Sequence, residues 1–155
     1  MRKKWIPAFA GMTNPRISYI NAMDWSDEGF LISAKPLGEA NAVAELLTRE
    51  HGRHLGLVRG GRSRRLRPLL QAGNVLSVTW RARLSDHLGA FNVEMIEPCA
   101  ARVLDDQAAL AAIGSLSGLA RLLPERDPHP GLYKEALRIL QALDDGRVWP
   151  ASLVR

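Results

Sequence analysis

Residues 74–84 alternate between apolar and polar side chains, and they form the clearest strand pattern in the sequence. The apolar positions are Leu76, Val78, Trp80, Ala82 and Leu84, and the polar positions between them are Ser77, Thr79, Arg81 and Arg83. A period of two over this length predicts a β-strand with one buried and one exposed face. A second alternating run follows at residues 91–95, after turn residues at 85–89, so we expect an antiparallel hairpin.

Upstream of this hairpin, residues 29–35 and 54–59 are short strand candidates. Residues 40–49 are ambiguous. Their alanine, glutamate and leucine content favours a helix, whereas Thr48 and the following His51-Gly52 allow a strand that ends in a turn. From propensity we expect a helix here.

After Pro98 the pattern becomes helical. Asp105 and Asp106 open an alanine- and leucine-rich segment that runs to Leu123, and acidic residues suit the positive N-terminal end of a helix. A second amphipathic helix is predicted over residues 132–143. Two such helices cannot enclose a core alone, so we expect them to pack on the sheet, to dimerise or to need further chain. We expect apolar surface to stay uncovered at Leu116, Leu119, Leu137 and Leu140.

Composition excludes several classes of protein. No apolar run reaches the roughly 20 residues that a membrane span needs, so we expect a soluble, cytoplasmic protein. The single cysteine, Cys99, excludes an internal disulfide and a multi-cysteine zinc site, and we interpret it as a buried residue in a reducing compartment. No acid, base and nucleophile converge in the sequence, so we predict no catalytic residues, no cofactor and no enzymatic activity.

The histidines and clustered acids do not form a metal-binding pattern. His51 and His54 bracket Gly52 at a turn, and we interpret them as a solvent-exposed pair rather than as metal ligands. We interpret the remaining candidates as solvated surface residues: His87, His129, Asp24, Asp27 and Glu28. We therefore predict no metal site.

Positive charge is concentrated between Glu50 and Asp86, where eight arginines occur and no acidic residue does. The net charge of the whole chain is only +5, so the rest of the sequence is negative. A focused arginine field suits a phosphate backbone because each guanidinium can bridge two phosphate oxygens. The alternative is a basic loop that only aids solubility, but solubility is served by dispersed charges of both signs. We predict DNA binding by Arg53, Arg59, Arg62, Arg64, Arg65, Arg67, Arg81 and Arg83.

Strand parity agrees with this prediction. Arg81 and Arg83 lie on the polar face of residues 74–84, and residues 62–67 form the connecting loop before that strand. A basic sheet face beside a basic loop is typical of proteins that bind single strands. Such proteins also offer aromatic rings for base stacking, yet parity places Trp80 and Phe91 in the core. We therefore expect backbone binding with little sequence preference, with base stacking on Trp80 as the alternative.

Residues 1–22 differ in character from the rest of the chain. They carry four positive charges and no acidic residue. Residues 4–13, KWIPAFAGMT, resemble a peptide that recurs at the ends of unrelated bacterial proteins. The apolar run is too short and is interrupted by Pro7, so it does not fit a signal peptide. We predict that residues 1–22 are a non-native or disordered extension and that Met23 is the natural first residue.

Four short motifs resemble the RecO family of DNA-repair proteins. They are MDWSDEG at residues 23–29, PLGE at 36–39, LTREHGR at 47–53 and VRGGRS at 58–63. Their order and spacing are similar to those of the family's N-terminal oligonucleotide-binding (OB) domain. The resemblance extends over residues 23–149.

The resemblance implies an α+β protein. A five-stranded antiparallel OB-fold β-barrel would occupy residues 23–98, and a partial α-helical domain would occupy residues 99–155. Residues 40–48 would then be the second strand, against the expectation from propensity. Members of the family usually continue further, so we expect the sequence to be truncated at its C-terminus.

The resemblance also implies a function and partners. RecO proteins bind single- and double-stranded DNA, anneal strands coated by single-strand-binding protein, and help RecA to load at gaps together with RecR. It therefore implies a nucleoid-associated protein whose partners are DNA and RecR. A contact with single-strand-binding protein would depend on the part of the family that this sequence lacks. Two alternatives stay open: an adaptor that binds mainly RecR, and an RNA-binding OB module.

Overall fold

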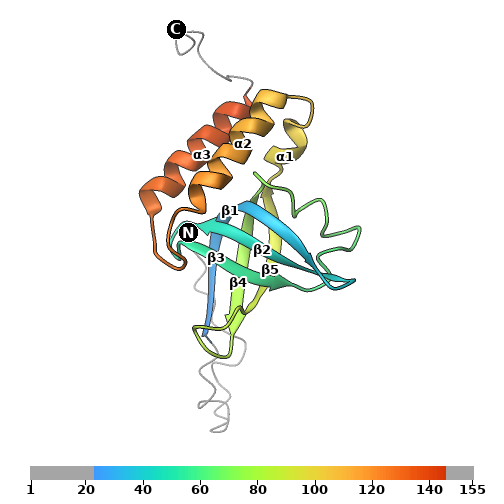
Figure 1. Ribbon diagram of the computed structural model, residues 1–155, viewed down its shortest axis with the longest axis vertical. Helices are drawn as coiled ribbons and strands as arrows, with labels where there is room; N and C mark the ends of the chain where they lie inside the picture. Colours follow the sequence, from blue (N-terminus) through green and yellow to red (C-terminus); the bar gives the residue numbers. More distant parts are fainter. Residues whose placement is uncertain (1–22, 146–155) are drawn as a thin grey trace.

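The computed structural model describes residues 23–145, which form a β-barrel with three helices at one end (Figure 1). In chain order the elements are β1 (Met23–Leu37), β2 (Asn41–Thr48), β3 (Arg53–Val58), β4 (Val75–Ala82), β5 (Ala90–Glu97), α1 (Cys99–Arg102), α2 (Gln107–Ala120) and α3 (Pro130–Asp144). The extension predicted for residues 1–22 lies outside the described residues. Within residues 23–145, every helix is too short or too polar to cross a membrane.

The barrel closes in the order β1-β2-β3-β5-β4 because β1 pairs with two neighbours. The first half of β1 pairs antiparallel with β4, and the second half of β1 pairs antiparallel with β2. A bulge between Leu31 and Ser33 bends the strand from one partner towards the other. Gly29 belongs to both ladders, and a Cβ atom there would lie 2.8 Å from the carbonyl oxygen of Leu47. A residue without a side chain is therefore required at this close approach.

This strand order is that of an OB fold and confirms the predicted fold class, with one correction. The barrel is not purely antiparallel, since β3 and β5 run parallel where they meet at Leu57 and Ala90. An odd number of strands cannot alternate in direction all the way round a closed barrel, so one parallel pair is unavoidable. The predicted hairpin is present, and Trp80 on β4 lies opposite Phe91 on β5.

The helix expected from propensity at residues 40–49 is wrong, because this segment is strand β2. Its side chains alternate between two buried environments. Leu46 packs inside the barrel, and Leu47 packs under the helices. An extended chain between β1 and β3 buries side chains on both of its faces. The free energy gained by this burial outweighs the modest helix preference of alanine and glutamate.

Two hydrophobic clusters share the strands. The barrel core contains Leu31, Ala42, Ala44, Leu46, Val58, Leu70, Leu76, Val78, Trp80, Phe91 and Val93. The helix core contains Phe30, Ile32, Leu47, Val75, Cys99, Val103, Ala109, Ile113, Ala120, Tyr133, Ala136, Leu140 and Leu143. Strand β1 contributes to both, since Leu31 is buried in the barrel core while Phe30 and Ile32 are buried in the helix core. The helices therefore cover the outside of the barrel at β1 and β2.

The two long helices lie side by side above the barrel (Figure 1). The carboxylate of Asp106 accepts a 3.0 Å hydrogen bond from the amide of Ala109 and so caps the start of α2. The expectation of uncovered leucines is wrong for Leu140, which is 1% exposed, whereas Leu119 is 63% exposed. Leu116 and Leu137 are half-buried against the helix core. The helices thus find their apolar partner in the barrel surface.

Candidate nucleic-acid interface

A groove of about 1220 Å³ runs along the barrel surface beside the loop that joins β3 to β4. The first residues of β1, the last residues of β4 and the first residues of β5 form one wall. The loop residues Arg65 and Leu66 also line the groove, as does Val58 at the end of β3. The groove is therefore lined by arginines from both regions in which the sequence concentrates them, residues 59–67 and residues 81–83.

Four of the predicted DNA-binding residues line this groove: Arg59, Arg65, Arg81 and Arg83. All four are exposed. Within residues 23–145, Arg81 is the one member of this set that forms an ion pair, with the carboxylate of Asp24 at 3.8 Å. Both of these side chains are more than half exposed, so their attraction is weak and is screened by salt. Most of the positive charge around the groove is thus available to an anion.

The arginine loop, residues 59–74, is anchored to the turn between β1 and β2. The guanidinium of Arg62 donates a 2.9 Å hydrogen bond to the carbonyl of Gly38, and its amide donates one of 3.0 Å to the carbonyl of Ala40. The amide of Gly60 donates to the side-chain oxygen of Asn41 at 3.0 Å. These contacts hold the start of the loop against a neighbouring turn.

Asn74 holds the other end of the arginine loop, and this side chain is almost fully buried. Its amide nitrogen donates to the carbonyls of Pro68 and Leu69, each at 3.1 Å. Its side-chain oxygen accepts a 3.0 Å hydrogen bond from the amide of Ala100 in α1. One carboxamide thus joins the loop, the start of β4 and the first helix.

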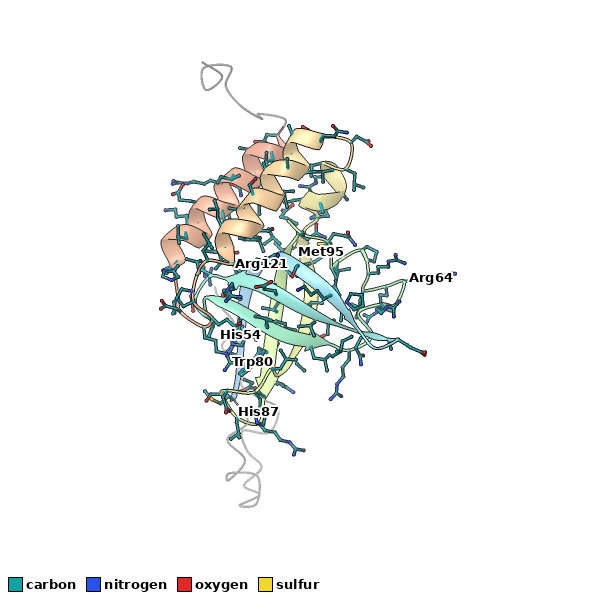
Figure 2. All side chains as sticks on the ribbon, viewed as in Figure 1. His54, Arg64, Trp80, His87, Met95 and Arg121 are labelled. Carbon is teal, nitrogen blue, oxygen red and sulfur yellow. The ribbon has the colours of Figure 1, made fainter. Side chains whose placement is uncertain are left out.

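The remaining predicted arginines lie elsewhere. Arg64 points outwards from the loop, away from the barrel (Figure 2). Arg62 and Arg67 line a second, smaller hollow of about 270 Å³. Arg53 is 15% exposed and donates at 2.7 Å to the carboxylate of Glu45, and its Nε donates at 2.9 Å to the carbonyl of Leu123. Arg53 is therefore part of the junction between barrel and helices and does not join the groove.

The aromatic side chains agree with the prediction that Trp80 belongs to the core. Trp80 is 2% exposed, and its indole nitrogen donates a 3.0 Å hydrogen bond to the carbonyl of Leu88. Sequence parity missed Trp25, which lies opposite Trp80 in the β1–β4 ladder and lines the groove while half-buried. Its ring stacks on that of His51 with 4.0 Å between centroids. The strand register was needed to find this residue.

The interpretation of His51 and His54 as an exposed turn pair is wrong. His54 is 3% exposed and packs edge-on against Trp80, with ring centroids 4.8 Å apart. Burial lowers the pKa of His54 from 6.5 to about 4. The buried imidazole of His54 is therefore neutral at pH 7.

Asp27 is likewise not a solvated surface residue, because its carboxylate is 1% exposed. It accepts hydrogen bonds of 2.8 Å from the amides of Glu28 and Glu50 and lies 2.9 Å from Nδ1 of His51. Asp27 therefore closes the turn between β2 and β3. His87 is exposed, as predicted.

Metal-binding geometry is not found in the described part of the chain. No group of three or more His, Cys, Asp or Glu side chains within residues 23–145 could hold a metal ion. Cys99 is buried, as predicted, and burial raises the pKa of its thiol. The groove itself is lined by four arginine side chains, which suit an extended polyanion.

Comparisons with known proteins agree with the motifs. A family model described as "Recombination protein O N terminal" matches residues 23–99. A curated DNA repair protein RecO of Methylorubrum populi is 54% identical over 133 residues, which are 86% of this chain and 54% of that protein. A RecO of Rhodopseudomonas palustris strain TIE-1 is 50% identical over 86% of this chain and 53% of its own length. One of Chelativorans is 53% identical over 77% of this chain and 48% of its own. The chain spans about half the length of the curated relatives it matches.

Proposed function

The chain belongs to the RecO family through its residues 23–99, and we propose that it is a DNA-binding mediator of recombinational repair. The observation that carries this proposal is the convergence of Arg59, Arg65, Arg81 and Arg83 on one groove. These residues come from two separate parts of the sequence, and the barrel brings them together around a space open to solvent.

The groove favours backbone contacts over base reading. The guanidinium groups that line the groove can each bridge two phosphate oxygens of a strand that lies along it. The aromatic residues Trp80 and Phe91 are buried, which leaves Trp25 as a partly exposed ring beside the groove. We therefore propose that the groove binds single-stranded DNA with little sequence preference. The affinity should vary strongly with salt concentration and only weakly with base sequence.

Fluorescence anisotropy with a labelled single-stranded oligonucleotide tests the proposal. We expect micromolar or tighter binding at low salt that weakens steeply as salt rises. The double variant Arg65→Ala/Arg83→Ala should reduce the slope of log affinity against log salt by about 1.4, because roughly 0.7 is lost with each phosphate contact to a single strand.

A matched control removes the same charge from a distant surface. Lys134 and Arg138 are both exposed on α3 and lie outside the groove. The double variant Lys134→Ala/Arg138→Ala should leave the slope unchanged. Equal effects of the two double variants would mean that only net charge matters, and absence of binding by the unmodified chain would reject the proposal outright.

The mediator activity itself is proposed from the family. We propose that the chain anneals complementary strands and assists RecA loading with RecR, without making or breaking covalent bonds, and that it acts at the nucleoid. We further propose that residues 23–98 are the DNA-binding domain and that residues 99–155 belong to a helical domain. An annealing assay with two complementary labelled oligonucleotides tests the first activity directly.

An adaptor role is the second candidate, favoured by apolar side chains on β3. Leu55 and Leu57 are only half-buried and stand outside both hydrophobic clusters. In this case RecR would be the main partner and DNA contact would be secondary. Co-elution with RecR, with and without neutralisation of Arg62, Arg64, Arg65 and Arg67, separates the two candidates. If the neutralised variant still bound RecR but no longer bound DNA, these arginines would serve DNA binding and not RecR binding.

A further inference from the structure

We propose that Arg126, in the loop between α2 and α3, is a positioning residue for the DNA groove, because it fixes the β4–β5 loop whose two ends line that groove. This inference rests on the proposed function of the groove. It links the helices to DNA binding through one side chain, although Arg126 lies far in sequence from the arginine-rich segment and outside the groove lining.

The backbone of Arg126 is held in an unusual conformation. Its φ angle is 61°, and it is the one non-glycine residue within 23–145 that has a positive φ. L-residues rarely adopt this region, and they keep it only where surrounding contacts hold it. Here the amide of Arg126 donates a 2.8 Å hydrogen bond to the carbonyl of Arg53. The next residue, Asp127, packs so closely on Gly52 that a Cβ atom there would lie 2.2 Å from the Asp127 carbonyl oxygen.

This conformation directs the guanidinium of Arg126 across the end of the barrel. Nη2 donates a 2.8 Å hydrogen bond to the carbonyl of His87, at the tip of the β4–β5 loop. The guanidinium carbon also lies 5.7 Å from the centroid of the Trp80 ring, within the range of a cation–π contact. His54, Trp80 and His87 follow one another towards this end of the barrel (Figure 2).

The β4–β5 loop is held at three successive carbonyls, since the amide of Leu57 on β3 donates a 3.0 Å hydrogen bond to that of Gly89. Trp80 donates to the carbonyl of Leu88 from inside the barrel, while Arg126 donates to that of His87 from the α2–α3 loop. Residues 83–88 are all exposed, and within the loop the described contacts include a single backbone hydrogen bond, from His87 to Leu84. An exposed loop with so few contacts of its own depends on these three donors for its position, and Arg126 is the one that holds its tip.

The ends of the β4–β5 loop are walls of the groove. Ala82 and Arg83 line the groove where β4 ends, and Ala90 and Phe91 line it where β5 begins. A shift of the loop would therefore change the spacing between Arg83 and Arg65, which line the same groove. Such a shift weakens binding through lost alignment rather than through a lost phosphate contact.

The test compares Arg126→Ala with Arg126→Gly in the full chain. Both variants remove the guanidinium, but glycine accepts a positive φ and alanine does not. We expect the glycine variant to be more stable to urea than the alanine variant. We nevertheless expect both to bind a single-stranded oligonucleotide about tenfold more weakly than the unmodified chain, because DNA must then reposition a loop that has lost a hydrogen bond from a charged donor.

Two readouts distinguish positioning from the alternatives. A positioning role leaves the slope of log affinity against log salt unchanged, whereas a direct phosphate contact by Arg126 would lower it by about 0.7. Hydrogen exchange of amides in residues 84–89 of the free protein should become faster in both variants, but not in the control Arg138→Ala. Unchanged hydrogen exchange in both variants would overturn the inference. So would an affinity for DNA that is restored in Arg126→Gly along with its stability, because the loss in Arg126→Ala would then reflect stability alone.

Failure of the proposed function would look different. If the unmodified chain bound no DNA, the groove would not be a DNA site and its link to Arg126 would fall with it. Hydrogen exchange would still decide whether Arg126 holds the loop. If the unmodified chain bound DNA and both Arg126 variants bound it equally well, the inference alone would be wrong.

Discussion

Arg121 at the end of α2 donates a 3.0 Å hydrogen bond from Nε to the carboxylate of Glu45 on β2. The same carboxylate accepts hydrogen bonds from Arg53 at 2.7 Å and from the hydroxyl of Ser33 at 3.1 Å. Burial raises the pKa of Glu45, but the three hydrogen bonds outweigh it and the pKa lies below its usual value. This buried carboxylate therefore connects the barrel to the helices.

Replacing Glu45 with glutamine should destabilise the fold by about 3 kcal/mol, because it leaves the mostly buried Arg53 with only the longer 3.7 Å ion pair to the exposed Glu125. Urea denaturation measures this change. The exposed pair of Glu135 and Arg138 offers a control, and Glu135→Gln should change stability by less than about 0.5 kcal/mol. Equally small effects of Glu45→Gln and Glu135→Gln would show that the hydrogen bonds to Glu45 do not stabilise the junction between the barrel and the helices.

The fold should lose stability as pH falls from about 6.5 to about 4, because His54 is buried in its neutral form. The unfolded chain binds a proton over this range and the folded chain does not, so acid favours unfolding by up to about 3 kcal/mol. Thermal or urea unfolding across this range measures the slope. The variant His54→Gln, which does not titrate, should have a flatter profile between about pH 5 and 6.5, where Glu45 is mostly ionised in both states. An unchanged profile would mean that another group titrates.

Two glycine-to-alanine substitutions should act in opposite directions. A Cβ at Gly56 would lie 2.4 Å from the Phe91 ring, so Gly56→Ala should cost about 1 to 3 kcal/mol through overpacking. Gly114 lies within α2 and has open space around the added Cβ, so Gly114→Ala should stabilise by roughly 0.5 to 1 kcal/mol. A tolerated Gly56→Ala would show that the contact between β3 and Phe91 can relax.

Trp80→Ala should cost roughly 3 to 5 kcal/mol, because Trp80 is a buried aromatic side chain of the barrel core. Any loss of DNA binding should then follow unfolding, as measured by circular dichroism on the same sample. A folded Trp80→Ala protein that binds no DNA would show instead that Trp80 stacks on bases.

Two arginines of one loop should behave differently towards DNA. Arg65 lines the groove, whereas Arg67 lines the second hollow. Arg65→Ala should lower the salt slope by roughly 0.7, and Arg67→Ala should leave it nearly unchanged. Because both residues are exposed, the unfolding midpoint should stay the same in both variants. A larger effect of Arg67 would assign DNA binding to the second hollow.

Local pattern was sufficient to predict β4, β5 and the two long helices, since each buries one face and shows it as a period in the sequence. It failed for β2, whose two faces are both buried and therefore show no alternation. It also failed for His54 and Asp27, because their burial depends on partners brought together by strand pairing. The eight arginines were readily identified as a group, but their division among groove, hollow, loop tip and Glu45 required three-dimensional structure.

The hydrogen bond between Asn74 and Ala100 has a consequence for how the chain is made. The Ala100 amide that satisfies the side-chain oxygen of Asn74 is translated 26 residues later. A nascent chain that has all five strands but not yet Ala100 would bury an acceptor without a donor, at a cost of about 1 to 3 kcal/mol. We therefore expect Asn74, and the arginine loop that it anchors, to become fully ordered only once the first helix has formed, so a nascent chain that still lacks this helix would offer nucleic acid a less ordered surface.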